Sequence, residues 1–182
     1  MDELSLYVLD IAMNSVRAGA TEILIELDDD GEWITFTVTD NGCGMTDEQL
    51  KKLSDPFFTT RKTRKVGLGI PFLKMLAEMT GGNVNIKSVS EKISKNHGTT
   101  ITARFCKNHI DFIPIGDMTQ TVITLIQGSP NINFTFRHVM PDKTVYLSCA
   151  ELHKILGDIS LAEPEILTWI GSYLNEQYSS VK

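Results

Sequence analysis

The chain has 182 residues, of which 42% are hydrophobic and 22% charged, a composition typical of a globular protein with one or two small domains. Its formal net charge of −6 argues against a nucleic-acid partner, because binding to phosphates needs net or clustered positive charge. No apolar run reaches the roughly 20 residues that cross a bilayer, and neither a leader pattern nor paired cysteines are present, which predicts a cytoplasmic protein without membrane contact.

A helix is expected to open the chain, over residues 4–18. Apolar residues recur there at helical spacing until Gly19 interrupts the pattern. Asp10, Asn14 and Arg17 are three or four residues apart, so they share a polar face of this helix, away from its apolar stripe. This polar face is a candidate functional surface.

A β-hairpin is expected next. Apolar and polar residues alternate over residues 23–27 and 34–38, and an acidic, glycine-containing turn separates the two runs. Asp40 follows the second strand directly. The turn Asn41-Gly42-Cys43-Gly44 cannot continue either regular structure easily, because its glycines favour unusual backbone angles. The chain is therefore expected to reverse sharply after Asp40.

The rest of the N-terminal half is expected to hold two helices and two strands. Residues 46–53 open with a capping-box pattern and predict a short helix. Gly67-Leu68-Gly69 precedes a second long helical pattern, which ends at a glycine pair. Residues 84–86 and 101–105 are read as strands. We place the end of this first domain at residue 106.

Residues 107–182 carry no readable motif and are expected to form a small mixed α/β extension of unknown role. The expected elements are strands at residues 121–127, 132–136 and 145–147, followed by two helices around Pro164. Trp169, Tyr173 and Leu174 recur at helical spacing, which favours core packing, with a partner-binding surface as the alternative.

Neither standard phosphate-binding loop is present, since GxxxxGK[ST] is missing and Gly67-Leu68-Gly69 lacks the third glycine of the dinucleotide fingerprint. What remains is an ordered set: Asn14, Asp40 with its glycine-rich turn, residues 55–61, Gly67 to Gly69, and residues 98–100. This order resembles the GHKL superfamily, the ATP-binding domain of DNA gyrase B, Hsp90, histidine kinases and MutL, over residues 4–106. The resemblance implies the Bergerat fold, an α+β, two-layer α/β sandwich with helices on one face of a mixed, mostly antiparallel sheet.

The resemblance assigns the adenine side of an ATP pocket to Asp40 and the turn after it. A carboxylate only accepts hydrogen bonds, so Asp40 suits the exocyclic amino group of adenine, where guanine offers a carbonyl. Gly42 and Gly44 let the backbone approach a flat base. The resemblance adds Met45 and Thr99 to this pocket.

The phosphate side is assigned to the two long helices and the segment that precedes the second one. Asn14 offers a neutral oxygen of the kind that Mg²⁺ prefers, and Arg17 matches a basic residue that histidine kinases direct toward phosphates. The Gly67-Leu68-Gly69 run would present backbone N–H groups at a helix start. The resemblance makes the preceding segment a lid over ATP. For its basic residues the alternative is a solvated loop, and for its aromatic residues it is plain core packing. The basic residues are Arg61, Lys62, Arg64 and Lys65, and the aromatic residues are Phe57 and Phe58.

Asp10 has two interpretations that the sequence leaves open. ATP-hydrolysing relatives place a Glu four residues before the metal-binding Asn, where it activates water as a general base. Asp10 stands at that position but is shorter by one methylene. It is either a base or metal-shell residue, or an ordinary solvated helix acid.

The expected function is that of a regulatory kinase that binds Mg-ATP and transfers phosphate to a separate partner protein. Only thirteen residues precede Asn14, and none of the four histidines stands in a phosphoacceptor context. The alternatives are a MutL- or gyrase-like ATPase whose nucleotide controls association, with a homodimer left open, and an ATP sensor with little turnover. Fold resemblance does not separate these three.

Overall fold

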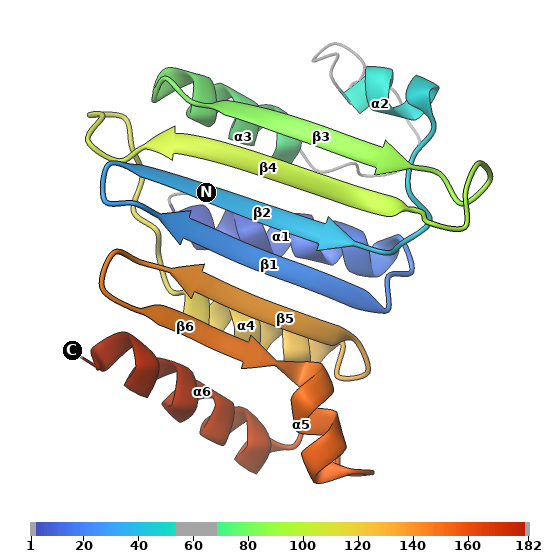
Figure 1. The fold of residues 1–182 in the computed structure, drawn as a ribbon, viewed down its shortest axis with the longest axis vertical. Helices are drawn as coiled ribbons and strands as arrows, with labels where there is room; N and C mark the ends of the chain where they lie inside the picture. The colour runs from blue at the N-terminus through green and yellow to red at the C-terminus, as the bar shows by residue number, and fades with distance from the viewer. Residues whose placement is uncertain (1–2, 54–68, 181–182) are drawn as a thin grey trace.

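The computed structural model describes residues 3–53 and 69–180, in which one sheet is covered by a layer of helices (Figure 1). The helices are α1 (Leu4–Arg17), α2 (Asp47–Leu53), α3 (Gly69–Met79), α4 (Met118–Gly128), α5 (Cys149–Leu156) and α6 (Pro164–Ser179). The strands are β1 (Glu22–Asp29), β2 (Trp33–Asp40), β3 (Asn83–Val89), β4 (Gly98–Cys106), β5 (Asn133–Val139) and β6 (Thr144–Ser148). Within the described ranges, no helix combines the length and apolar character that a membrane span needs.

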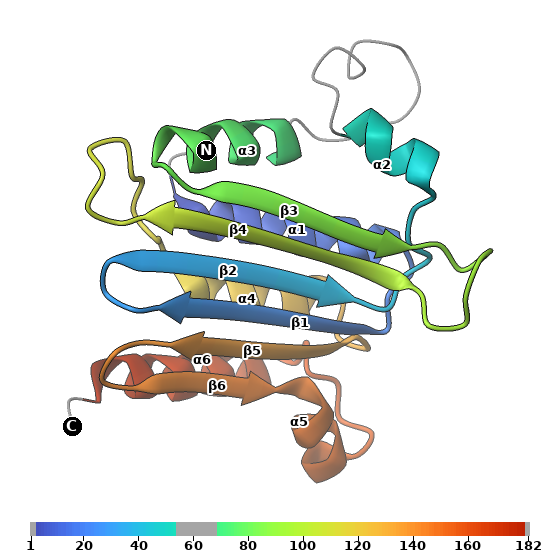
Figure 2. The same cartoon turned by 45° about the horizontal axis from the view of Figure 1, so that its top comes forward.

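The six strands lie in the order β3-β4-β2-β1-β5-β6 (Figure 2). Neighbouring strands are antiparallel, except that β1 and β5 run parallel in a register that pairs Ile23 with Phe134. The expected α+β fold with a mixed, mostly antiparallel sheet is therefore confirmed. The boundary at residue 106 stays a prediction, and β5 and β6 continue the sheet of the N-terminal half.

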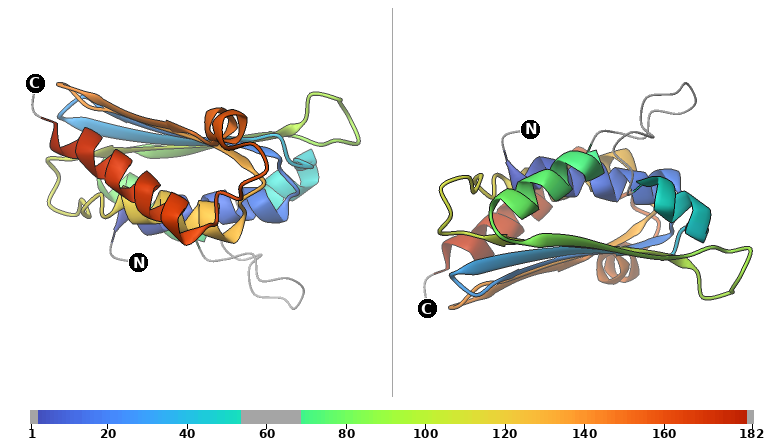
Figure 3. Two further views of the ribbon diagram at one scale, coloured as in Figure 1. Left: turned by 90° about the horizontal axis from the view of Figure 1, so that it is seen from below. Right: turned by 90° about the horizontal axis from the view of Figure 1, so that it is seen from above.

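Helices α1, α3, α4 and α6 lie on one side of the sheet, as Figure 3 shows, and the hydrophobic core is formed between them and the sheet. Strand residues alternate, so that Ile25, Phe36 and Phe136 face the helices and are 1% exposed. Helix α1 contacts α3 on one side and α4 on the other, and α4 contacts α6. The backbone N–H of Leu4 also donates to the carbonyl of Pro114 at 2.9 Å. One core thus spans both halves of the chain and fixes α1 over the central strands.

The three residues expected to share a stripe on the last helix are divided between two environments. Leu174 is completely buried against the core, whereas Trp169 and Tyr173 are 49% and 37% exposed. Their rings stack on each other with centroids 5.1 Å apart. Core packing therefore accounts for Leu174, and the two aromatic residues form an exposed stack.

The expected strand at residues 121–127 is wrong, because these residues belong to helix α4. The β-branched residues Thr121, Val122 and Ile123 favour a strand by propensity. In the structure Val122, Leu125 and Ile126 are buried on one face, which is the three-to-four spacing of a helix packed on a core. Tertiary burial outweighs the small intrinsic preference of these residues.

Asp117 is expected to stabilise this helix as its N-cap. Its side chain accepts a hydrogen bond from the backbone N–H of Gln120 at 2.8 Å. Asp117→Ala should therefore lower the free energy of unfolding by about 1 kcal/mol in urea denaturation. Glu163 at the N-cap of α6 makes no side-chain capping bond, so Glu163→Ala is the matched control and should change little. Equal losses in the two variants would contradict the role of the cap.

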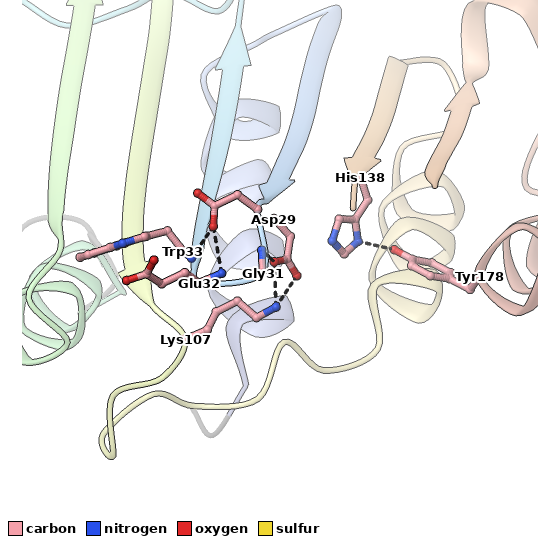
Figure 4. A network of polar contacts seen from close by, with 8 residues as sticks. Asp29, Gly31, Glu32, Trp33, Lys107, His138 and Tyr178 are labelled. Atoms are coloured by element: carbon pink, nitrogen blue, oxygen red, sulfur yellow. Dashed lines mark hydrogen bonds and ion pairs between the residues drawn. The ribbon is translucent and has the colours of Figure 1, made fainter. Parts of the chain in front are cut away.

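A buried polar network lies at the end of the sheet where β1 and β5 finish (Figure 4). Lys107 donates to both carboxylate oxygens of Asp29 at 2.7 Å. Beside this pair His138 is 3% exposed, and its Nδ1 lies 2.9 Å from the hydroxyl of Tyr178. Nε2 of His138 has no hydrogen-bond partner among the described residues. Burial lowers the pKa of His138 below its usual 6.5, although the Asp29 carboxylate opposes this effect.

The lowered pKa of His138 makes stability depend on pH in one direction. The unfolded chain binds the proton more readily, so stability is complete above about pH 6.5 and falls as the pH drops through the lower pKa of the folded state. Within that window the slope should approach about 1.4 kcal/mol per pH unit. Urea midpoints measured between pH 7.5 and 5.5 should fall less steeply for His138→Gln than for the wild type. If the urea midpoint fell equally with pH in both proteins, His138 would not be the cause of the loss of stability.

Candidate functional site

Asp40, the last residue of β2, is fixed by donors from three elements. Its Oδ2 accepts from the hydroxyl of Ser15 on α1 at 2.5 Å. Its Oδ1 accepts from the backbone N–H groups of Gly42, at 2.9 Å, and of Thr99 on β4, at 3.2 Å. The carboxylate therefore has one orientation, set by α1, by the turn that follows β2 and by β4. The sequence prediction that joined Asp40 and Thr99 in one site is geometrically consistent with these contacts.

The Asp40 carboxylate keeps capacity for one more donor. Two carboxylate oxygens offer about four acceptor positions, and the three contacts described above occupy two on Oδ1 and one on Oδ2. A ligand N–H group can take the remaining position on Oδ2, whereas a ligand carbonyl there would face an acceptor and be repelled. The arrangement can therefore select a ligand that presents an amino group.

Two glycines allow the turn after β2 to pack closely on its neighbours. A Cβ at Gly42 would lie 2.9 Å from Cβ of Ala18 and 3.0 Å from its carbonyl oxygen. Gly44 has φ of 63°, and a Cβ there would collide with the carbonyl of Val89. No larger residue fits at either position without movement of the backbone. The turn thus lies directly against the end of α1 and the end of β3.

Hydrogen bonds anchor the turn on both sides. They join Cys43 N to Ala18 O at 2.9 Å, Glu91 N to Cys43 O at 2.9 Å, Met45 N to Ser88 Oγ at 2.8 Å, and His97 Nδ1 to Gly42 O at 2.5 Å. One of these contacts comes from α1, and the others come from β3 and the loop between β3 and β4. The turn is consequently a rigid support for whatever lies against Asp40.

The polar face of α1 carries the residues predicted for it. Nη1 of Arg17 donates to the side-chain oxygen of Asn14 at 2.8 Å. One turn earlier, the carboxylate of Asp10 faces Gly69, the first residue of α3, so closely that a Cβ at position 69 would strike Oδ2. The helix therefore places a carboxylate, an amide oxygen and a guanidinium on one polar face, and Asp10 on that face lies against the start of α3.

Several predicted site residues lie outside the described ranges. They are Phe57, Phe58, Arg61, Lys62, Arg64, Lys65, Gly67 and Leu68. Of the glycine run that precedes α3, Gly69 alone is described. For the residues outside the described ranges, the roles in the lid and in phosphate binding stay predictions.

The described residues fit a magnesium ion that the ligand and water largely hold. No group of three or more His, Cys, Asp or Glu residues within the described ranges forms a cage for a metal. Asp10 and Asn14 place hard oxygen atoms one helical turn apart on α1. Mg²⁺ in nucleotide sites takes one or two protein oxygens and fills the rest of its shell with waters and phosphates. The donor set on α1 is suited to that role.

A separate cavity of about 340 Å³ lies between α2, α3 and β3. It is lined by Leu50, Lys51, Leu53, Ile70, Lys74, Val84 and Ile86. The three donors to the Asp40 carboxylate, from Ser15, Gly42 and Thr99, are not among these lining residues.

The sequence reasoning missed Ser15, Ser88 and His97. Ser15 is 4% exposed and occupies the apolar stripe of α1 together with Val8, Ile11 and Ala12. A hydroxyl at helical spacing within an apolar stripe needs a buried partner, and that signal could have identified Ser15. Ser88 and His97 gave no comparable signal, because their contacts are made across the sheet and the loop.

The chain belongs to the family of histidine kinase-, DNA gyrase B- and HSP90-like ATPases, whose profile matches residues 2–109. Two curated proteins that are similar to part of this chain in sequence are a sporulation kinase and a sensor histidine kinase. Sporulation kinase B of Bacillus subtilis (strain 168) is 34% identical over 100 residues, which are 53% of this chain and 22% of that protein. Sensor histidine kinase ZraS of Salmonella typhi is 32% identical over 94 residues, 50% of this chain and 20% of that protein. The chain thus spans about a fifth of the length of these relatives.

Two solved structures share the fold over a longer stretch. The N-terminal domain of a DNA repair protein has a TM-score of 0.56 and is 20% identical in sequence. The matched region is 81% of this chain and 53% of the chain of that structure. The Aquifex aeolicus MutL ATPase domain, complexed with ADP, has a TM-score of 0.52 at 16% identity and covers 81% and 63% of the two chains. The likeness therefore extends past the residues that the family profile matches.

Proposed function

We propose that this chain binds Mg-ATP at the Asp40 site and transfers the γ-phosphate to a separate protein. The observation that carries the ATP assignment is the Asp40 carboxylate, which three donors orient and which keeps one acceptor position for an amino group. Adenine presents an amino group there, and guanine does not. Membership of an ATPase family and the ADP complex of the MutL neighbour support the same ligand.

The triphosphate and its metal are assigned to α1 and to the start of α3. Asn14 and Asp10 would supply oxygen to Mg²⁺, and Arg17, which contacts Asn14, would balance phosphate charge. Asp10 lies close enough to Gly69 for both to border the same ligand. Lid residues such as Arg61 and Lys62 are proposed to complete the neutralisation. Phosphoryl transfer needs little more from a protein than positioning and charge stabilisation.

A kinase is favoured over a simple ATPase by two features of this chain. Arg17 follows Asn14 at the position where histidine kinases place a basic residue, and the curated relatives are sensor and sporulation kinases. The phosphoacceptor is proposed to be a residue of another protein. A MutL-like switch is the second candidate, because the likeness to the MutL ATPase domain continues through 81% of this chain.

Incubation with γ-labelled ATP separates the candidates. Purified chain, alone and with lysate of its source cells, is followed for labelled protein and for free phosphate. Label on another protein, lost in Asn14→Ala and retained in the exposed strand variant Asn83→Ala, supports the kinase. Phosphate release without labelled protein supports the switch, and tight binding with neither product supports a sensor. A wild type that does not bind Mg-ATP would overturn all three.

A further inference from the structure

One peptide unit of the turn after β2, the unit that joins Gly42 to Cys43, is held at both of its ends. Its N–H, on Cys43, donates to the carbonyl of Ala18 at the end of α1, at 2.9 Å. Its carbonyl oxygen, on Gly42, lies 2.5 Å from Nδ1 of His97. A carbonyl oxygen only accepts, so Nδ1 of His97 carries the proton and donates it in this contact. The imidazole therefore fixes the peptide unit that follows Gly42, the residue whose own N–H donates to Asp40.

His97 is the first of three consecutive residues that touch the segment from Asp40 to Gly42. A Cβ at the next residue, Gly98, would collide with the backbone carbonyl of Asp40. The N–H of Thr99 donates to Oδ1 of Asp40 at 3.2 Å, and the N–H of Gly42 donates to the same oxygen at 2.9 Å. The N–H of Gly42 belongs to the preceding peptide unit, and Gly42 joins that unit to the one held by His97. A shift of Gly42 would therefore change the donors on Oδ1 and the orientation of the carboxylate.

We propose that His97 is a positioning residue of the base-binding site. By donating to the Gly42 carbonyl, it restrains Gly42, the residue whose own N–H donates to Asp40, and so sharpens the preference of Asp40 for a ligand amino group. His97 acts through Asp40 and does not itself bind the ligand. The inference rests on the proposed binding of ATP at this site, and it adds a residue from the loop between β3 and β4 to the specificity of that site.

The position of the donor distinguishes this role from general packing. In His97→Asn the amide Nδ2 is bonded to Cγ, as Nδ1 is in histidine, so the variant keeps a donor near the same place. In His97→Ala the donor is lost. His109, which is exposed and pairs with Asp111 at 3.5 Å, provides the control variant His109→Ala. A packing role would not be restored by asparagine, whose side chain is much smaller than imidazole.

The test compares binding of Mg-ATP with binding of Mg-ITP, whose base carries a carbonyl in place of the amino group. His97→Ala should weaken ATP binding about three- to tenfold, the range expected for one lost hydrogen bond. ITP binding should change less than twofold, so that the ratio of the two dissociation constants falls. His97→Asn and His109→Ala should bind ATP within about twofold of the wild type. Equal losses for ATP and ITP, or no rescue by asparagine, would overturn the proposal.

Hydrogen exchange of the ligand-free chain gives a second readout. The Cys43 amide should exchange faster in His97→Ala than in the wild type and in His97→Asn, because its peptide loses one of its two anchors. An unchanged rate would contradict the geometry. If the wild type binds ATP and Asp40→Asn does not, but His97→Ala binds as the wild type does, the role of His97 alone fails. If the wild type binds no ATP, the proposed function fails with it.

Discussion

Replacing Asp40 with asparagine is expected to weaken Mg-ATP binding by at least about 100-fold, equivalent to roughly 3 kcal/mol. The carboxylate receives donors from Ser15, Gly42 and Thr99. An asparagine NH₂ would face one or more of these donors and could not accept from the adenine amino group. Loss of a hydrogen bond to a charged group costs about 1.5 to 3 kcal/mol, and a misplaced donor adds to this cost. Isothermal calorimetry measures the change directly.

The matched control for this experiment is Asp28→Asn. Asp28 is exposed on β1, one residue before the strand ends, and its replacement makes the same change in charge and volume as Asp40→Asn. It should leave the dissociation constant within about twofold of the wild type. If Asp40→Asn bound Mg-ATP with wild-type affinity, Asp40 would not be part of the ATP site. A similar loss of affinity in Asp40→Asn and Asp28→Asn would indicate a long-range effect of charge.

The parts of this molecule that were predicted correctly are those that local chemistry determines. The capping box is an example, since Thr46 N donates to Gln49 Oε1 at 2.8 Å and Gln49 N donates to Thr46 Oγ1 at 3.3 Å. The short turn between β1 and β2, and Asp40 at the end of β2, also follow from neighbouring residues. Motif residues at the ends of elements can therefore be located from sequence, because each end has its own local signal.

The features that were not predicted depend on contacts between distant parts of the chain. Strand β5 lies beside β1 although more than a hundred residues separate Ile23 from its partner Phe134. Ser15 meets Asp40 from 25 positions away, and His97 meets Gly42 from 55. Local propensity carries no information on such pairs. The misread helix α4 has a related origin, because burial against α1 and α6 outweighs the strand preference of its β-branched residues.

The ion pair between Lys107 and Asp29 predicts the largest loss of stability outside the core. The Asp29 side chain is 7% exposed and that of Lys107 is 25% exposed. Lys107→Met keeps much of the aliphatic stem but leaves a buried carboxylate without its cation, which typically costs 3 to 5 kcal/mol. Partial access of water to Lys107 reduces this, so we expect the free energy of unfolding to fall by about 2 to 4 kcal/mol in urea denaturation.

An exposed pair on the same sheet provides the comparison. Arg137 and Glu26 form an ion pair in which the side chains are 48% and 28% exposed, and Arg137→Met should cost no more than about 1 kcal/mol. Adding Asp29→Asn to Lys107→Met should recover part of the loss, because the uncompensated charge is then gone. If the single and double variants were equally unstable, packing of the lysine stem would be the cause. If Lys107→Met were no worse than Arg137→Met, the carboxylate of Asp29 would be solvated in solution, and its effect on His138 would be absent as well.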